Sequence, residues 1–155
     1  MALKLLTLAA AGALAAFAGS GPAASAQAGA GACSLSLRAE ADGESFDMAG
    51  RAEGAARARL VEQTGANFAA AASHLCASRV VTTANLRPYS KLLVRNAEAA
   101  TEPNVYDDAE EHPGVLIIEF AFADAGPPTQ AQVEAALRCW RNPHGPGCST
   151  EDVGP

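Results

Sequence analysis

The amino-acid sequence predicts a small two-layer α+β domain, in which an antiparallel sheet packs against one long N-terminal helix and a C-terminal helix. Three observations lead to this fold class. Residues 55–78 are rich in Ala, Arg, Glu and Leu and carry one apolar stripe at helical spacing. Residues 91–95 and 115–122 have the composition of strands, and residues 129–140 have that of a second helix. The order of helix, strands and helix, without βαβ alternation, favours an α+β domain.

The first elements are a short strand and the long helix. Residues 34–38 alternate between polar and apolar side chains, which predicts an edge strand. In the long helix, Val61, Phe68 and Leu75 fall seven residues apart and share one face. Gly65 lies between them and marks either a break in the helix or a close contact with a neighbouring element.

The elements after the long helix alternate between extended segments and turns. The β-branched residues of 79–83 predict an extended segment, and Pro88 predicts a turn over 86–89. A strand over 91–95 follows. The clearest strand is 115–122, which is apolar on both faces and should therefore be central in the sheet.

A helix from Thr129 to about Trp140 closes the predicted domain. Thr129 and Gln132 have the spacing of a capping box, and the break at Gly126-Pro127-Pro128 precedes them. On this helix Val133, Leu137 and Trp140 share a side, so that side should face the core.

The N-terminus has the three-part pattern of a secretory signal peptide. Lys4 precedes an apolar stretch over 5–18, and the triplet Ala26-Gln27-Ala28 has the small residues of a cleavage site. We expect residues 1–28 to be removed after Ala28, with Ala26 as the alternative site. Residues 29–155 then form a single disulfide-stabilised domain, secreted or periplasmic, with no membrane span after cleavage.

The composition limits both the core and the class of partner. Alanine accounts for 38 residues, half of the apolar class, and residues 29–155 contain only 27 large aliphatic or aromatic residues. Cleavage removes Lys4, which leaves ten basic against 17 acidic residues and a formal charge of −7. This acidic balance argues against a nucleic-acid partner. A thin core of this kind is expected to depend on covalent bonds.

The four cysteines predict two disulfides, because an even number in an exported chain is most simply explained by pairing. Three connectivities are possible. We favour Cys139 with Cys148, because the eight residues between them include two prolines and two glycines and can turn back. Cys33 would then pair with Cys76. The four residues are too dispersed for the usual zinc spacings.

An acidic linker joins the two best strands and contains no Lys or Arg between Asn96 and Gly114. Its carboxylates and imidazole could bind a divalent cation or supply a general acid and base. The spacing matches no known metal-binding loop, and a solvated loop is the simpler interpretation. The candidate metal ligands are Asp107, Asp108, Glu110, Glu111 and His112.

The segment between Cys139 and Cys148 is the second candidate site. A disulfide would make it a rigid loop that displays Trp140, Arg141, Asn142 and His144. Rigid loops reduce the ordering cost of binding, and Trp and Arg are frequent interface residues. The simpler interpretation is that Trp140 covers the core and the disulfide clamps the C-terminus.

These features favour an exported binding or interaction domain over an enzyme, since no nucleophile-base motif or phosphate loop is present. The partner would be a protein or a small molecule, and we expect no cofactor. The alternative is a hydrolase-like or metal-assisted enzyme that uses the acidic linker 98–112.

Overall fold

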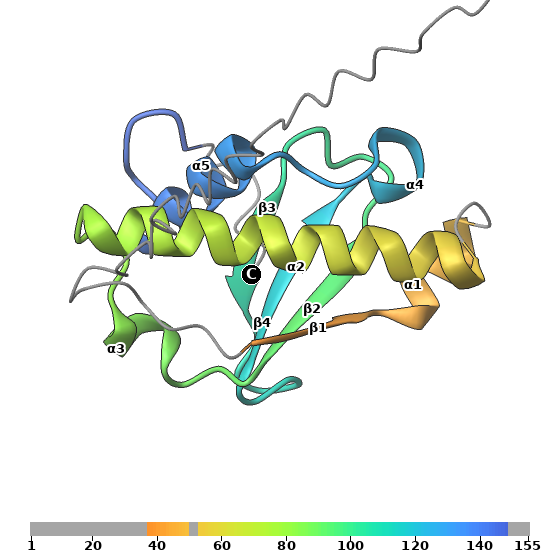
Figure 1. Ribbon diagram of the computed structural model, residues 1–155, viewed down its shortest axis with the longest axis horizontal. Coiled ribbons are helices and arrows are strands. Elements are labelled where there is room, and N and C mark those ends of the chain that lie inside the picture. The colour runs from red at the N-terminus through yellow and green to blue at the C-terminus, as the bar shows by residue number, and fades with distance from the viewer. Residues whose placement is uncertain (1–36, 50–52, 149–155) are drawn as a thin grey trace, which may run out of the picture.

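The computed structural model describes residues 37–49 and 53–148. The predicted signal peptide 1–28 and Cys33 lie outside these ranges. The described chain forms a small α+β domain with two layers (Figure 1). Its elements are β1 (Arg38–Ala41), α1 (Gly43–Ala49), α2 (Gly54–Ala77), α3 (Thr83–Leu86), β2 (Lys91–Asn96), β3 (Asn104–Asp107), β4 (Val115–Phe120), α4 (Phe122–Ala125) and α5 (Gln130–Arg141).

The sheet is mixed, with strand order β1-β2-β4-β3. β2 is parallel to both β1 and β4, and only β3 and β4 are antiparallel. The prediction of an antiparallel sheet is therefore wrong for two of the three strand pairs. Parallel neighbours need a long crossover, and α2 supplies one between β1 and β2. The first strand was predicted four residues too early, but the predicted order of a strand at 34–38, the long helix and a strand at 91–95 was already that of such a crossover. The expectation of no βαβ alternation is therefore wrong for this part of the chain.

One face of the sheet carries the core, because α2 and α5 both pack on that face (Figure 1). Leu92 and Val94 of β2 and Leu116 and Ile118 of β4 are fully or almost fully buried there. They pack in one cluster with apolar residues of the two helices, among them Phe68, Leu75, Val133 and Leu137. β4 lies between β2 and β3, which confirms that the most apolar strand is central.

The long helix α2 runs without interruption through Gly65. A Cβ atom at Gly65 would lie 2.9 Å from the Cβ of Ala39 in β1, which is closer than side-chain atoms normally approach. Gly65 therefore marks a close contact between helix and strand, and the alternative of a helix break is wrong. Absence of a side chain here lets α2 approach the sheet.

The segment 79–83 is not the extended segment that its β-branched residues predicted. Arg79 adopts a positive φ of 60° after the last turn of α2, and the amide of Val80 donates to the carbonyl of Leu75. Thr82 then caps α3, because its hydroxyl oxygen accepts from the amide of Asn85. Helix-ending and helix-starting hydrogen bonds override strand propensity in this short stretch.

The C-terminal helix α5 begins as predicted, and both hydrogen bonds of the capping box between Thr129 and Gln132 are formed. Asn67 of α2 donates to the carbonyl of Pro128 just before this helix, at 2.7 Å. About two turns further along α2, His74 Nδ1 lies 2.9 Å from a carboxylate oxygen of Glu134. These contacts fix α5 alongside α2.

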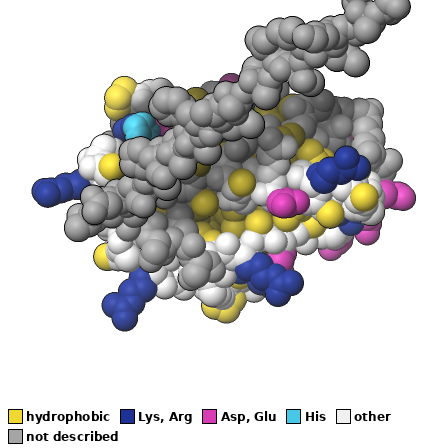
Figure 2. Space-filling model, in the orientation of Figure 1, with side chains coloured by type: hydrophobic (Ala, Val, Ile, Leu, Met, Phe, Trp, Pro, Cys, Tyr) yellow, Lys and Arg dark blue, Asp and Glu magenta, His cyan; other side chains and the backbone are white. Residues whose placement is uncertain are grey.

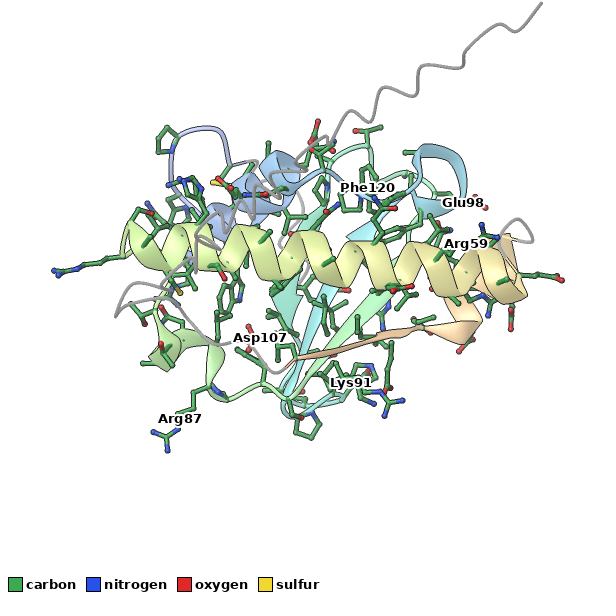
Figure 3. All side chains as sticks on the ribbon, in the orientation of Figure 1. Arg59, Arg87, Lys91, Glu98, Asp107 and Phe120 are labelled. Carbon is green, nitrogen blue, oxygen red and sulfur yellow. A yellow bond between two sulfur atoms is a disulfide. The ribbon has the colours of Figure 1, made fainter. Side chains whose placement is uncertain are left out.

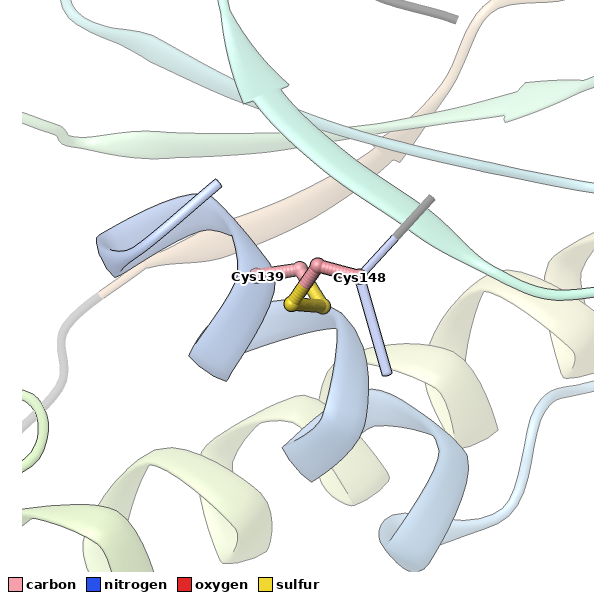
Figure 4. Close-up of a disulfide and its surroundings, with 2 residues drawn as sticks. All are labelled: Cys139 and Cys148. Carbon is pink, nitrogen blue, oxygen red and sulfur yellow. A yellow bond between two sulfur atoms is a disulfide. The ribbon is translucent and has the colours of Figure 1, made fainter. Parts of the chain in front are cut away.

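The predicted disulfide between Cys139 and Cys148 is confirmed (Figure 4). It joins the last turn of α5 to a residue nine positions later in the sequence. Cys76, at the end of α2, is also disulfide-bonded, and its predicted partner Cys33 lies outside the described residues.

Candidate functional site

The end of α5 packs against the end of β3 through Trp140. The indole is half-buried against the apolar core, and its Nε1 donates to Oδ1 of Asp107 at 3.2 Å. The ring of Tyr89 meets it edge-on, with the two centroids 5.9 Å apart. Trp140 is thus held in one orientation by an acceptor and an aromatic neighbour that come from distant parts of the sequence.

The loop after Trp140 starts from this fixed base. The guanidinium of Arg141 lies over the indole of Trp140, 5.4 Å from the ring centroid. Arg141, Asn142 and His144 are exposed. The loop therefore presents a cation and an imidazole to solvent beside a partly buried indole.

Backbone hydrogen bonds and a covalent bond close the same loop. The carbonyl of Asn142 accepts from the amide of Gly145 at 2.8 Å, and the carbonyl of Gly145 accepts from the amide of Cys148 at 3.2 Å. The disulfide then returns the chain to Cys139 (Figure 4). Few backbone conformations satisfy all three constraints, so the exposed side chains stand on a rigid support.

The electrostatics of this cluster keep the phenol of Tyr89 neutral. Partial burial, followed by the neighbouring Asp107 carboxylate, raises the pKa of Tyr89, and Arg141 opposes this shift. The Asp107 carboxylate therefore interacts with both aromatic side chains, as the acceptor of the Trp140 hydrogen bond and as a neighbour of the Tyr89 phenol.

The acidic linker forms structure of its own instead of one uniform loop. Its middle is strand β3, so Asp107 belongs to the sheet and contacts Trp140. The Asp108 carboxylate accepts from the amides of Glu110 and Glu111, at 3.1 and 3.0 Å, and closes a tight turn. Glu98 lies beside α4, at the other end of the sheet from Asp107 (Figure 3).

The candidate metal ligands are thus engaged in different local structures. Glu110 and Glu111 are exposed, and the amide of His112 donates to the carbonyl of Asp108 at 2.8 Å. Within residues 37–49 and 53–148, no group of three or more His, Cys, Asp or Glu side chains is placed to hold a metal ion. The linker supplies structural contacts to the fold at Asp107 and Asp108.

The face of the sheet opposite the helices carries a network that the sequence analysis did not identify. Arg95 of β2 donates to Asp42 at 2.9 Å and to the hydroxyl of Tyr106 at 3.0 Å, and lies 3.8 Å from Glu119. Partial burial, with Glu119 beside it, raises the pKa of Tyr106 to about 12. These groups satisfy one another, which is typical of a structural network on a sheet face.

Sequence reasoning missed Tyr89 and Asp107 as the partners of Trp140. The three residues come from a turn, an edge strand and a helix, and 33 positions separate Asp107 from Trp140. No local pattern links them. Only the packing of α5 on β3 brings them together.

No helix among the described residues is long and apolar enough to cross a membrane. Comparisons of the chain with known protein families, with curated protein sequences and with solved structures find no match.

Proposed function

We propose that the protein is an exported binding domain that docks a partner through the loop between Cys139 and Cys148. The observation that carries this proposal is the rigid support of the loop. Arg141 stacks on an indole that Asp107 and Tyr89 hold in place, and the disulfide closes the chain behind it. A loop that is already ordered loses little conformational entropy when a partner binds.

The exposed side chains define the chemistry of the contact. Arg141 can donate two parallel hydrogen bonds to a carboxylate. Because the guanidinium already stacks on Trp140, the side chain loses less conformational entropy when it binds. Asn142 and His144 add hydrogen-bonding groups on the same loop. These groups suit a partner that presents an acidic side chain or a chain terminus to the loop.

Export is the second part of the proposal. The signal-peptide pattern of residues 1–28 and the disulfide between Cys139 and Cys148 both fit an oxidising compartment outside the cytoplasm. A partner would then be another exported or surface protein, or a small molecule in the same compartment.

The test is recovery of a partner by the loop. The chain, expressed with its own N-terminus and isolated from the exported fraction, serves as bait for the same fraction of the source cells. A double variant, Arg141→Ala with His144→Ala, should lose at least nine-tenths of the recovered partner. Arg59→Ala is the matched control, because Arg59 is an exposed arginine at the far end of α2 (Figure 3).

The control variant should recover as much partner as the unchanged protein. Equal recovery by the double variant would remove the loop from the function. Intact-mass measurement of each bait confirms that the disulfide is present, so that a lost bond is not mistaken for a lost contact.

A further inference from the structure

A groove lies between the edge strand β1 and the N-terminal half of α2, far from the Cys139–Cys148 loop. Its volume is about 870 Å³. Ala39 and Ala41 of β1 form one wall, and Ala58 and Val61 of α2 form the other. Figure 2 shows hydrophobic side chains gathered in a band along this side of the helix, with acidic side chains beside it. The walls consist of small side chains, so the space can take larger ones.

The strand that borders the groove has one edge that no other described strand pairs with. In the part of the chain that the structure describes, β1 is the outermost strand of the sheet and pairs only with β2. The amide of Arg38 donates to the carbonyl of Ser90, directly before β2, at 3.2 Å, and the amide of Asp42 donates to the carbonyl of Val94 in β2 at 2.8 Å. Because backbone groups alternate in direction along a strand, the N–H and C=O groups of Ala39 and Ala41 point to the opposite side, toward the groove. Two residues thus offer a complete set of donors and acceptors to another extended chain.

The rim of the groove is acidic. Among the described residues that line it, four are acidic, namely Glu40, Asp47, Glu53 and Glu62, and Arg57 is basic. Arg57 pairs with Asp47, and Glu40 lies 2.7 Å from Lys91. Glu53 and Glu62 have no ion-pair partner among the described residues, so two carboxylates remain to attract a positive charge.

We propose that this groove binds an extended, basic peptide segment of a partner protein, which adds a strand to the sheet at β1. The backbone of the segment pairs with Ala39 and Ala41. Apolar side chains at alternate positions fill the space over Ala58 and Val61, and Lys or Arg side chains approach Glu53 and Glu62. This site is separate from the loop and does not depend on the function proposed for it.

The charge of the rim selects this occupant over an acidic one. A second copy of this chain would bring its own Glu40 and the net negative charge of the molecule to the same edge. Extended basic segments have the complementary charge and need no fold of their own to pair with a strand.

The test uses a fluorescent hexapeptide of alternating Lys and Val with blocked ends as the probe. Fluorescence anisotropy with the full chain should give saturable binding that weakens as salt is raised. A hexapeptide of alternating Glu and Val should bind at least tenfold more weakly. The Lys-Val peptide with N-methyl groups on alternate amides cannot pair with a strand, so it should also bind at least tenfold more weakly.

Two variants of the protein locate the binding. Ala41→Pro removes an amide that the fold does not use, since proline is tolerated at the open side of an edge strand. Ala41→Pro should lower the affinity for the Lys-Val peptide at least tenfold. Ala41→Ser, which keeps the amide, should bind the peptide as tightly as the unchanged protein does. Glu53→Gln with Glu62→Gln should reduce both the affinity and its salt dependence.

Absence of binding, or equal binding of the N-methylated peptide, would overturn the proposal. Because the N-methylated peptide is tested on the unchanged protein, this result does not depend on the folding of Ala41→Pro. Sedimentation at the same protein concentration tests whether a second copy of the chain occupies the groove instead. A dimer that Ala41→Pro converts to a monomer would show that a second copy, and not a peptide, takes the β1 edge.

Discussion

The two ends of the long helix α2 support two different surfaces. Near its C-terminal end, the loop after α5 is held by a disulfide, by the bond from Trp140 to Asp107 and by two hydrogen bonds of its own backbone. At its N-terminal end, α2 begins at Gly54 without a side-chain cap, beside the open edge of β1. The first surface is made of oriented side chains, and the second is made of backbone groups and small side chains.

The two proposed sites would give a domain with a thin core two kinds of recognition surface. A surface of oriented side chains must be rigid before it binds, and the covalent bond supplies that rigidity. A strand edge needs no such support, because the hydrogen bonds to the sheet already hold it in place. Changes at one end should therefore leave the other end intact.

The largest expected effect comes from removal of the disulfide. Cys139→Ser with Cys148→Ser should lower the free energy of unfolding by about 3 kcal/mol, because the unfolded chain is no longer cross-linked. Partner recovery through the loop should fall, and binding of the Lys-Val peptide to the groove should stay the same. Urea unfolding measures the stability, the partner-recovery experiment measures the loop, and anisotropy measures the groove. Equal loss at both ends would contradict the separation of the two surfaces.

Gly65→Val tests the other end. A side chain at this position meets Ala39 and should push α2 away from β1, at a cost of about 2 kcal/mol in unfolding free energy. The same change should lower the affinity of the groove for the Lys-Val peptide and leave partner recovery through the loop unchanged. As control, Gly65→Ala combined with Ala39→Gly removes the clash, and a double-mutant cycle should give a coupling energy that favours the pair. Independent effects of the two changes would show that this contact is not close.

Trp140→Phe tests one hydrogen bond at the base of the loop. The phenyl ring keeps most of the packing against Tyr89 but cannot donate to Asp107, so the unfolding free energy should fall by about 1 kcal/mol. Partner recovery should fall by more than this loss of stability explains. The reason is that a phenyl ring attracts the guanidinium of Arg141 less strongly than the indole does. The control is Phe120→Leu, a core change away from the loop. If it reduces recovery as much, the effect is one of stability alone.

The smallest effect concerns the sheet face away from both surfaces. The folded pKa of Tyr106, about 12, lies above the ordinary value of 10.0, so the protonated phenol favours the folded state. Its contribution to stability is complete below pH 10 and is lost as the pH rises through 12. Phenolate absorbance at alkaline pH should show the delayed ionisation, and Tyr106→Phe should reduce the alkaline loss of stability. Ionisation of both tyrosines near pH 10 in the folded protein would contradict this burial.

The sequence predicts the parts of the fold that depend on local chemistry. The apolar strand after Gly114, the capping box at Thr129 and the proline- and glycine-rich loop before Cys148 all lie in single segments. The last two are confirmed, and the strand predicted over 115–122 is confirmed over 115–120, because Phe122 begins α4. The parts that depend on pairing over long distances were not predicted. β3 is a short strand in a polar linker, and its role appears only when β4 and α5 pack against it.

The same reason limits prediction of the candidate sites. Arg141, Asn142 and His144 could be selected from the sequence because they lie between two cysteines. The sequence suggests Asp107 as a metal ligand, because none of its neighbours in the sequence indicates that it accepts a hydrogen bond from the distant indole of Trp140. The groove at β1 could not be predicted, because it depends on how α2 packs beside the edge strand, which no local pattern specifies.

The most direct test of the loop as a docking surface is a photo-cross-linker in living cells. A photoreactive phenylalanine in place of Asn142, on the loop, should join the protein to one partner upon illumination. The same residue in place of Ala66, exposed on α2, serves as the control. A cross-linked partner is expected at position 142, and it should disappear when Arg141→Ala is added. The same products from both positions, or none from position 142, would contradict this expectation.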